Sequence, residues 1–109
     1  MLQKVFRLPI QEWIKDKKFK TIAIKGNFFI VRERKNGKNF SRFGVLVSAK
    51  IFKGAVKRNR IKRKVFEMIR VSGLYQNPGK DILISVLPSA AGSPEEKIIE
   101  SLSVIFKKI

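Results

Sequence analysis

The sequence predicts an α+β fold: a single two-layer sandwich domain in which helices pack on a mixed, mainly antiparallel sheet. Two observations support this prediction. Segments with strand-like patterns and segments with apolar residues at helical spacing follow one another in the order αβββαβα. The chain has 109 residues, which is the size of one domain with one core, so a single domain over residues 1–109 is expected.

The first element is expected to be a short helix over residues 8–18. Pro9 suits a first helical position, where its missing N–H costs no hydrogen bond. Ile10, Trp13 and Ile14 then recur at a spacing that places them on one helix face. Basic residues follow this segment and lead into the next element.

Three strands are expected in the first half of the chain. Residues 20–25 alternate two isoleucines with other side chains, and residues 27–34 are rich in β-branched and aromatic side chains. Asn36-Gly37 is typical of a hairpin turn, so the return strand is expected over residues 42–49. The sequence therefore predicts an antiparallel meander.

The second half is predicted to contain a helix, a buried strand and a final helix. Apolar residues at helical spacing predict the helix over about residues 56–70, and Gly73 ends it. A turn at residues 77–79 leads to residues 81–87, whose nearly continuous apolar character is typical of a buried central strand.

The last helix has the clearest start signal of the chain. Ser93 is expected to be the N-cap, Pro94 the first helical residue, and Glu96 the second half of a capping box. Apolar residues between Ile98 and Ile109 then form one helical stripe, which is expected to pack on the sheet.

The charge of the chain indicates a polyanionic partner. Lys and Arg number 25 against 8 Asp and Glu, for a formal net charge of +17. Such a charge favours nucleic acid as the partner, with an anionic membrane surface second. The absence of Cys and His excludes disulfides, thiolate metal sites and histidine chemistry. No signal peptide or membrane span is recognisable, so a soluble cytoplasmic protein is expected.

The cations concentrate on the helix over residues 56–70 and on the segment before it. At about 100° per residue, Asn59, Arg60, Arg63 and Arg70 lie opposite the apolar stripe of this helix. Arg side chains bind phosphate through a planar fork, and the helix start near Lys57 offers backbone N–H groups. A merely solvated face would mix signs to gain ion pairs, whereas this face stacks like charges and favours an anion.

Two segments carry a family resemblance. Arg42–Lys50 reads RFGVLVSAK, and Ala55–Arg63 reads AVKRNRIKR. Together they resemble the signature of bacterial ribonuclease P protein subunits, in which a strand ending in a Ser-Lys-Lys-like sequence precedes an RNR helix. Ala49 stands where that family usually has Lys, so one basic contact is missing. The resemblance covers about residues 20–106.

The resemblance implies a fold of the same element order with a left-handed βαβ crossover. It implies a non-catalytic protein component of a ribonucleoprotein endoribonuclease, which binds a catalytic RNA and the 5′ leader of precursor tRNA. Magnesium ions act through the RNA, and the protein alone binds no cofactor. The implied partners are ribonuclease P RNA, with one protein per RNA, and precursor tRNA, without a membrane.

The resemblance and the basic helix together give the candidate site residues. The candidates for RNA binding are Lys50, Lys53, Lys57, Arg58, Asn59, Arg60, Lys62, Arg63 and Arg70. The family's leader cleft lies between the first helix and the sheet, and its candidates here are Trp13, Phe28, Phe29 and Arg42. Ordinary core packing is the alternative for the three aromatic residues. Neighbours on a strand face opposite ways, so at least one of Phe28 and Phe29 is expected to point inward.

Other functional classes explain the sequence less well. An enzyme acting alone would need carboxylates or Lys, and the eight acids form no close metal-binding pair in sequence. A basic ribosomal protein would share the charge and size but leaves the RNR pattern unexplained. A membrane-active protein would show a broad exposed apolar face, whereas the apolar stripes here have the width that a sheet covers.

Overall fold

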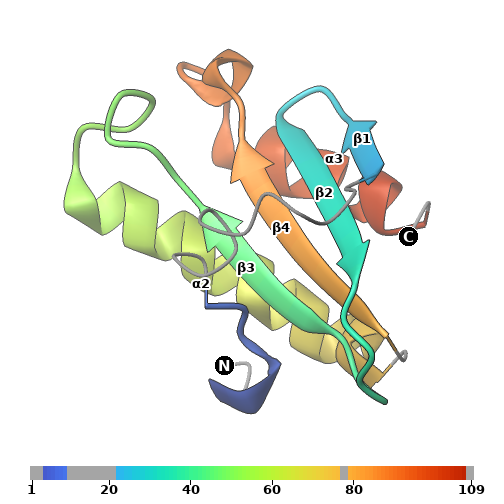
Figure 1. Ribbon diagram of the computed structural model, residues 1–109. Coiled ribbons are helices and arrows are strands. Elements are labelled where there is room, and N and C mark those ends of the chain that lie inside the picture. The colour runs from blue at the N-terminus through green and yellow to red at the C-terminus, as the bar shows by residue number, and fades with distance from the viewer. Residues whose placement is uncertain (1–3, 10–21, 77–78, 108–109) are drawn as a thin grey trace.

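The computed structural model describes residues 4–9, 22–76 and 79–107 (Figure 1). The predicted α+β class is confirmed, with helices on one mixed sheet. The elements are η1 (Lys4–Phe6), β1 (Ile22–Lys25), β2 (Phe29–Lys35), β3 (Arg42–Leu46), α2 (Ala55–Ser72), η2 (Leu74–Gln76), β4 (Lys80–Val86), η3 (Pro88–Ala90) and α3 (Glu95–Phe106). Of the helix expected over residues 8–18, Leu8 and Pro9 are not helical and the rest lies outside the described residues.

The strand order of the sheet is β1-β2-β4-β3. β1 and β2 form the expected antiparallel hairpin, and β4 is antiparallel to β2 but parallel to β3. The predicted meander is therefore wrong for its third strand, because β4 lies between β2 and β3. β4 is the most deeply buried strand, and a strand that is covered on both faces belongs in the centre of a sheet.

The turn at Asn36-Gly37 accordingly spans the start of β4 instead of closing a two-stranded hairpin. The amide of Asn36 donates to the carbonyl of Gly79, directly before β4, at 2.9 Å. Gly37 has a positive φ of 70°, which glycine adopts without strain. The chain reverses direction here, but through a loop over residues 36–41, so the predicted hairpin turn is wrong and the strands that the loop connects are not neighbours.

Both helices lie behind the sheet in the view of Figure 1. β3 and β4 are parallel and adjacent, and α2 connects them. With these strands pointing upward, β4 lies to the right of β3 while α2 passes behind, so the crossover is left-handed (Figure 1). The family resemblance implied this hand, which runs against the usual right-handed rule.

The core lies between one face of the sheet and the two helices. Its buried residues are Phe29 and Val31 of β2, Phe43 and Val45 of β3, Ile82, Ile84 and Val86 of β4, Ile61, Val65 and Ile69 of α2, and Ile98, Leu102 and Ile105 of α3, with Val47, Phe52 and Ala90 from the connections. The apolar stripes expected on both helices are thus the faces that pack on the sheet.

The capping box expected at the last helix is wrong. Helix α3 begins at Glu95, Pro94 occupies the N-cap position, and no side chain caps the helix. The hydroxyl of Ser93 instead donates to the carbonyl of Ser89 at 3.2 Å, and the amide of Ser93 donates to Ala90. Ser93 therefore belongs to the turn after η3, which draws its side chain away from the helix.

The first described segment, here called the N-terminal strap (residues 4–8), runs along the outer edge of β3. Arg7 forms a parallel bridge with Phe43, and the amide of Leu8 donates to the carbonyl of Phe43 at 2.8 Å. The ring of Phe6 packs on Phe40 and Tyr75, with centroid distances of 5.4 and 4.5 Å. The strap is thus held by both backbone and ring contacts.

Candidate nucleic-acid interface

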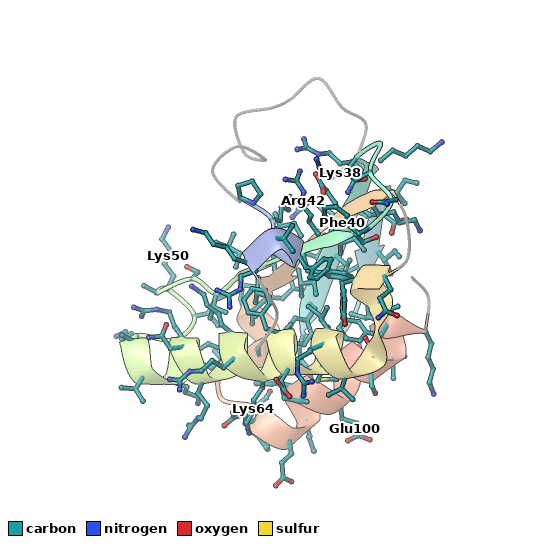
Figure 2. The ribbon with its side chains drawn as sticks, turned by 90° about the horizontal axis from the view of Figure 1, so that it is seen from below. Lys38, Phe40, Arg42, Lys50, Lys64 and Glu100 are labelled. Carbon is teal, nitrogen blue, oxygen red and sulfur yellow. The ribbon has the colours of Figure 1, made fainter. Side chains whose placement is uncertain are left out.

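Helix α2 presents a basic outer surface because its apolar residues are used by the core. Ile61, Val65 and Ile69 face the sheet, and the helix has seven Lys or Arg residues against a single acid, Glu67. Asn59 and Arg63 are exposed, and Lys62 is half-buried on the flank. Figure 2 shows side chains of α2 projecting away from the sheet, Lys64 among them.

The loop before α2, residues 48–54, adds two further cations to this surface. Lys50 and Lys53 are exposed, and neither side chain has an interaction partner among the described residues. Ser48 organises the loop, because its hydroxyl accepts from the amide of Lys50 at 3.1 Å and its carbonyl accepts from the amides of Ile51 and Phe52. Ser48 belongs to the recognised sequence pattern, but its role was missed.

Arg58 is turned toward the protein. Its Nη1 donates to the carbonyl oxygens of Phe52 at 2.8 Å and Lys53 at 2.9 Å. The ring of Phe52 is buried in the core, and the ammonium of Lys57 lies 4.9 Å from its centroid. Two of the predicted RNA contacts, Arg58 and Lys57, therefore have contacts within the protein.

Arg60 and Arg70 also have carboxylate partners. Arg60 and Lys64 contact opposite oxygens of Glu95 at the start of α3, at 3.3 and 3.1 Å. Arg70 pairs with Glu67 one turn earlier on the same helix. This exposed hydrogen bond lowers the pKa of Glu67 and raises the pKa of Arg70. The pair across the helices has no signal in the sequence, because Arg60 and Glu95 lie far apart along the chain.

The face of the sheet opposite the helices carries a second group of cations. Arg32 and Arg34 of β2 and Arg42 of β3 alternate with core residues and therefore point to this face. Leu8 of the strap packs on Leu83 there. Arg42, a candidate for the leader cleft, lies on this face, whereas most of the first helix that should border the cleft lies outside the described residues.

The aromatic candidates for the cleft do not form it among the described residues. The prediction for Phe29 is wrong, because its side chain is fully buried under the helices. Phe28 is half-buried and packs against the same core. The expectation that at least one of the two points inward is confirmed. Trp13 lies outside the described residues.

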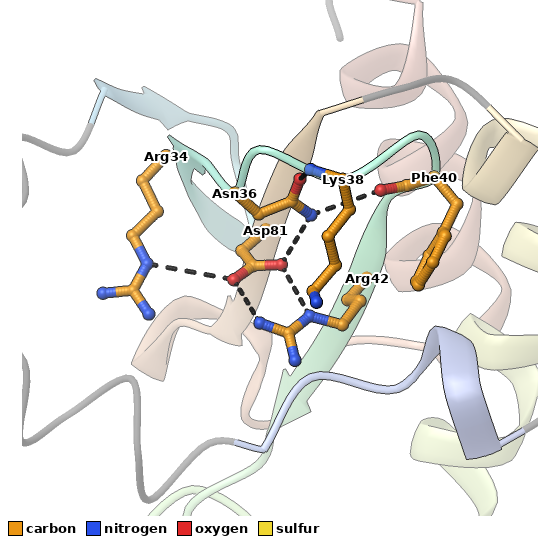
Figure 3. Close-up of polar contacts among 6 residues, drawn as sticks. All are labelled: Arg34, Asn36, Lys38, Phe40, Arg42 and Asp81. Carbon is orange, nitrogen blue, oxygen red and sulfur yellow. Dashed lines mark hydrogen bonds and ion pairs between the residues drawn. The ribbon is translucent and has the colours of Figure 1, made fainter.

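Arg42 is held by a buried carboxylate (Figure 3). Its Nε and Nη2 donate to the two oxygens of Asp81 at 2.9 and 2.7 Å, and Asp81 is only 2% exposed. Asn36 donates to the same carboxylate at 2.9 Å, and Arg34 lies 4.0 Å from it. The network connects the β2–β3 loop to the start of the central strand β4 and fixes Arg42 in place.

The charge of Asp81 depends on these partners. Burial alone would raise the pKa of Asp81, but hydrogen bonds from Arg42 and Asn36 and the nearby positive charges lower it below its ordinary value. Replacing Asp81 with Asn is expected to lower the free energy of unfolding at pH 7 by about 2 kcal/mol, because charge-assisted hydrogen bonds are lost. Urea unfolding of both proteins measures the difference.

The pH dependence of this difference follows from the lowered pKa. The stabilisation is fully present above the ordinary carboxyl value of 3.8 and is lost as the pH falls through the lower value of the folded state. The difference between wild type and Asp81→Asn should therefore shrink in acid. Glu67→Gln, at an exposed site, is the control. Equal stability of the Asp81→Asn and wild-type proteins at pH 7 would contradict the role of the network.

One further carboxylate of the sheet, that of Glu33, also faces a cation. Glu33 on β2 lies 3.6 Å from the ammonium of Lys80 on the neighbouring strand β4.

Within residues 4–9, 22–76 and 79–107, no group of three or more acids is arranged to hold a metal ion. In the same part of the chain, no helix combines the length and apolarity that a bilayer crossing requires.

Comparison with known proteins connects these features to one family. The family model described as Ribonuclease P matches residues 11–109. A ribonuclease P protein component of Synechocystis is 38% identical over 68 residues, which cover 62% of this chain and 55% of that protein. The corresponding protein of Chromobacterium violaceum is 33% identical over 84 residues, covering 75% of this chain and 67% of that protein. This chain spans little more than half the length of the first curated relatives that it matches.

Solved structures share the fold over nearly the whole chain. The RNase P protein of Staphylococcus aureus matches with a TM-score of 0.81 at 27% identity, covering 96% of this chain and 95% of that one. The RNase P protein of Thermotoga maritima matches with a TM-score of 0.77, also at 27% identity, covering 94% of this chain and 96% of that one. The mixed sheet with two helices on one face is therefore a fold that these proteins have in common.

Proposed function

Because this chain belongs to the ribonuclease P protein family, we propose that it is the protein subunit of a ribonuclease P. In this proposal it binds the catalytic RNA and the 5′ leader of precursor tRNA, and it assists endonucleolytic removal of the leader. The observation that carries the proposal is the continuous basic surface formed by the loop at residues 48–54 and the outer face of α2. Lys50, Lys53 and Arg63 are exposed there without carboxylate partners among the described residues.

The RNA subunit is proposed to bind this surface. Cations that neutralise phosphates release counterions and supply much of the affinity for RNA. Asn59, exposed between these cations, offers both a donor and an acceptor to a sugar or a base edge. One protein per RNA and a cytoplasmic location are parts of the same proposal.

The leader is proposed to lie on the opposite, open face of the sheet. Three arginines point to this face from the strands on either side of β4: Arg32 and Arg34 from β2, and Arg42 from β3. Such a basic surface can bind the phosphates of a single strand of RNA. Asp81 holds the guanidinium of Arg42 in place, and because both Arg42 and Arg34 lie at this one carboxylate, the face keeps a net positive charge. The two RNA surfaces then lie on different sides of the domain.

The chemistry is proposed to reside in the RNA and its magnesium ions. Four of the six described carboxylates, Asp81, Glu95, Glu33 and Glu67, each face one or more cations of the protein, and the other two, Glu96 and Glu100, are exposed on α3. The protein then serves to bind and orient the substrate and to screen the repulsion between the phosphates of the catalytic RNA and those of the precursor. Magnesium ions on the RNA would supply the activated water.

The test is cleavage of precursor tRNA by a bacterial ribonuclease P RNA at low magnesium. The wild-type protein should restore 5′ processing, and the Lys62→Ala/Arg63→Ala protein should restore at least about tenfold less because two phosphate contacts are lost. Lys97→Ala/Lys107→Ala removes the same charge from α3 and its C-cap and is the matched control. If the wild type binds structured RNA but does not stimulate cleavage, a general or ribosomal RNA-binding role replaces the proposal.

A further inference from the structure

We propose that Arg58 is a positioning residue, which fixes the loop at residues 48–54 so that Lys50 and Lys53 can bind RNA phosphates. The inference rests on the proposed function, because it concerns the same RNA surface. It differs from the sequence-based expectation, in which Arg58 itself touches the RNA. The structure directs the guanidinium of Arg58 to the backbone of its own loop.

The contacts of Arg58 close the loop onto the helix. One nitrogen, Nη1, donates its two hydrogens to two successive carbonyls, those of Phe52 and Lys53, at 2.8 and 2.9 Å. The amide of Arg58 donates to the carbonyl of Gly54 at 3.2 Å. The side chain and the backbone of one residue therefore hold three consecutive carbonyls at the end of the loop.

The opposite end of the loop is fixed by Ser48. Its hydroxyl and carbonyl accept from the amides of Lys50, Ile51 and Phe52. The ring of Phe52 is 5% exposed and belongs to the core, so it anchors the middle of the loop. Lys50 and Lys53 lie on either side of this anchor, and their directions are set by the two hydrogen-bonded ends.

An arginine is required for this arrangement because of its shape and charge. Its planar group delivers two N–H bonds from one nitrogen in a fixed plane, whereas a lysine ammonium is a compact charge on a flexible stem. Its positive charge also offsets the negative ends of two carbonyl dipoles that point to one place. Without it, those carbonyls would meet the RNA phosphates at the surface and repel them.

The test is a double-mutant cycle measured by equilibrium binding to a folded bacterial ribonuclease P RNA. Arg58→Lys keeps the charge but loses the geometry, and it should weaken binding about tenfold. Lys97→Arg, at an exposed lysine of α3 outside this surface, also exchanges the two cationic groups at constant charge; it is the control and should change binding less than about twofold. Lys50→Ala/Lys53→Ala should weaken binding about tenfold in the wild type but less than about threefold in the Arg58→Lys background.

The salt dependence separates positioning from simple loss of structure. Arg58→Lys should lower the slope of log K against log salt by about one to two units, although no charge is removed, because Lys50 and Lys53 lose their phosphates. Thermal unfolding of each variant controls for folding. Independent, multiplicative effects of Arg58→Lys and Lys50→Ala/Lys53→Ala would overturn the inference.

A second variant keeps the proposal testable if Arg58→Lys does not fold. Lys50→Ala/Lys53→Ala leaves Arg58 and the loop contacts in place, so wild-type binding by this protein would show that the loop does not bind RNA and would overturn the inference. Failure of the proposed function has a different result. In that case the wild-type protein does not bind ribonuclease P RNA, and the inference fails with it.

Discussion

Raising the salt concentration from about 50 to 200 mM is expected to weaken binding of this protein to ribonuclease P RNA about a thousandfold, because counterion release dominates the affinity. The basic surface has five cations without a carboxylate partner among the described residues: Lys50, Lys53, Lys57, Lys62 and Arg63. With about five or six phosphates neutralised, the slope of log K against log salt is expected to be near −5. Binding measured at a series of salt concentrations gives this slope.

Two double variants test whether the basic surface of α2 accounts for the slope of log K against log salt. Lys62→Ala/Arg63→Ala should reduce its magnitude by about two units, since each phosphate contact contributes nearly one. Lys97→Ala/Lys107→Ala carries the same change in net charge but lies at α3 and its C-cap, and its slope should equal that of the wild type. Equal slopes for both double variants would show that overall charge, and not this surface, binds the RNA.

Replacing Phe29 with Ala is expected to lower the free energy of unfolding by about 3–5 kcal/mol, the usual cost of removing a buried aromatic side chain. Phe29 is fully buried at the start of β2, where the sheet meets the two helices. Urea unfolding measures the change at constant m-value. This prediction also tests the assignment of Phe29 to the core instead of the leader cleft.

Phe28→Ala is the matched control, since it removes the same ring at the neighbouring position. Phe28 is only half-buried, so a smaller loss of about 1–2 kcal/mol is expected. A Phe29→Ala protein with wild-type stability and weakened binding to precursor tRNA would place Phe29 at the RNA surface after all.

The sequence was sufficient to predict the elements of the fold because burial leaves a periodic pattern. Ile61, Val65 and Ile69 repeat at helical spacing, and they are the residues by which α2 packs on the sheet. The order of the strands was not predicted, because two signals disagreed. The Asn36-Gly37 turn favoured direct pairing of the strands that it joins, while the apolar β4 required a central place. Burial on both faces decided the outcome, since it involves the whole strand.

The basic helix was equally evident in the sequence, but the partners of its arginines were not. Arg60 contacts Glu95, far along the chain, only because α3 returns beside α2. Arg58 contacts backbone carbonyls, which have no signature in a sequence. A count of cations therefore overestimates the number of residues available to RNA. Only the packing of α3 and of the loop before α2 shows which cations have partners within the protein and which are available to RNA.

The N-terminal strap has a consequence for the behaviour of the protein in concentrated solution. An unpaired sheet edge is a template on which another chain can add a strand, and this is a common route to self-association. On the β3 side, the strap already occupies the carbonyl of Phe43, and the ring of Phe6 fastens it to Phe40 and Tyr75. At the other edge, β1 has only four residues and ends in Lys25. Pairing between the sheet edges of two molecules is thus disfavoured, because one edge is covered by the strap and the other is short and charged.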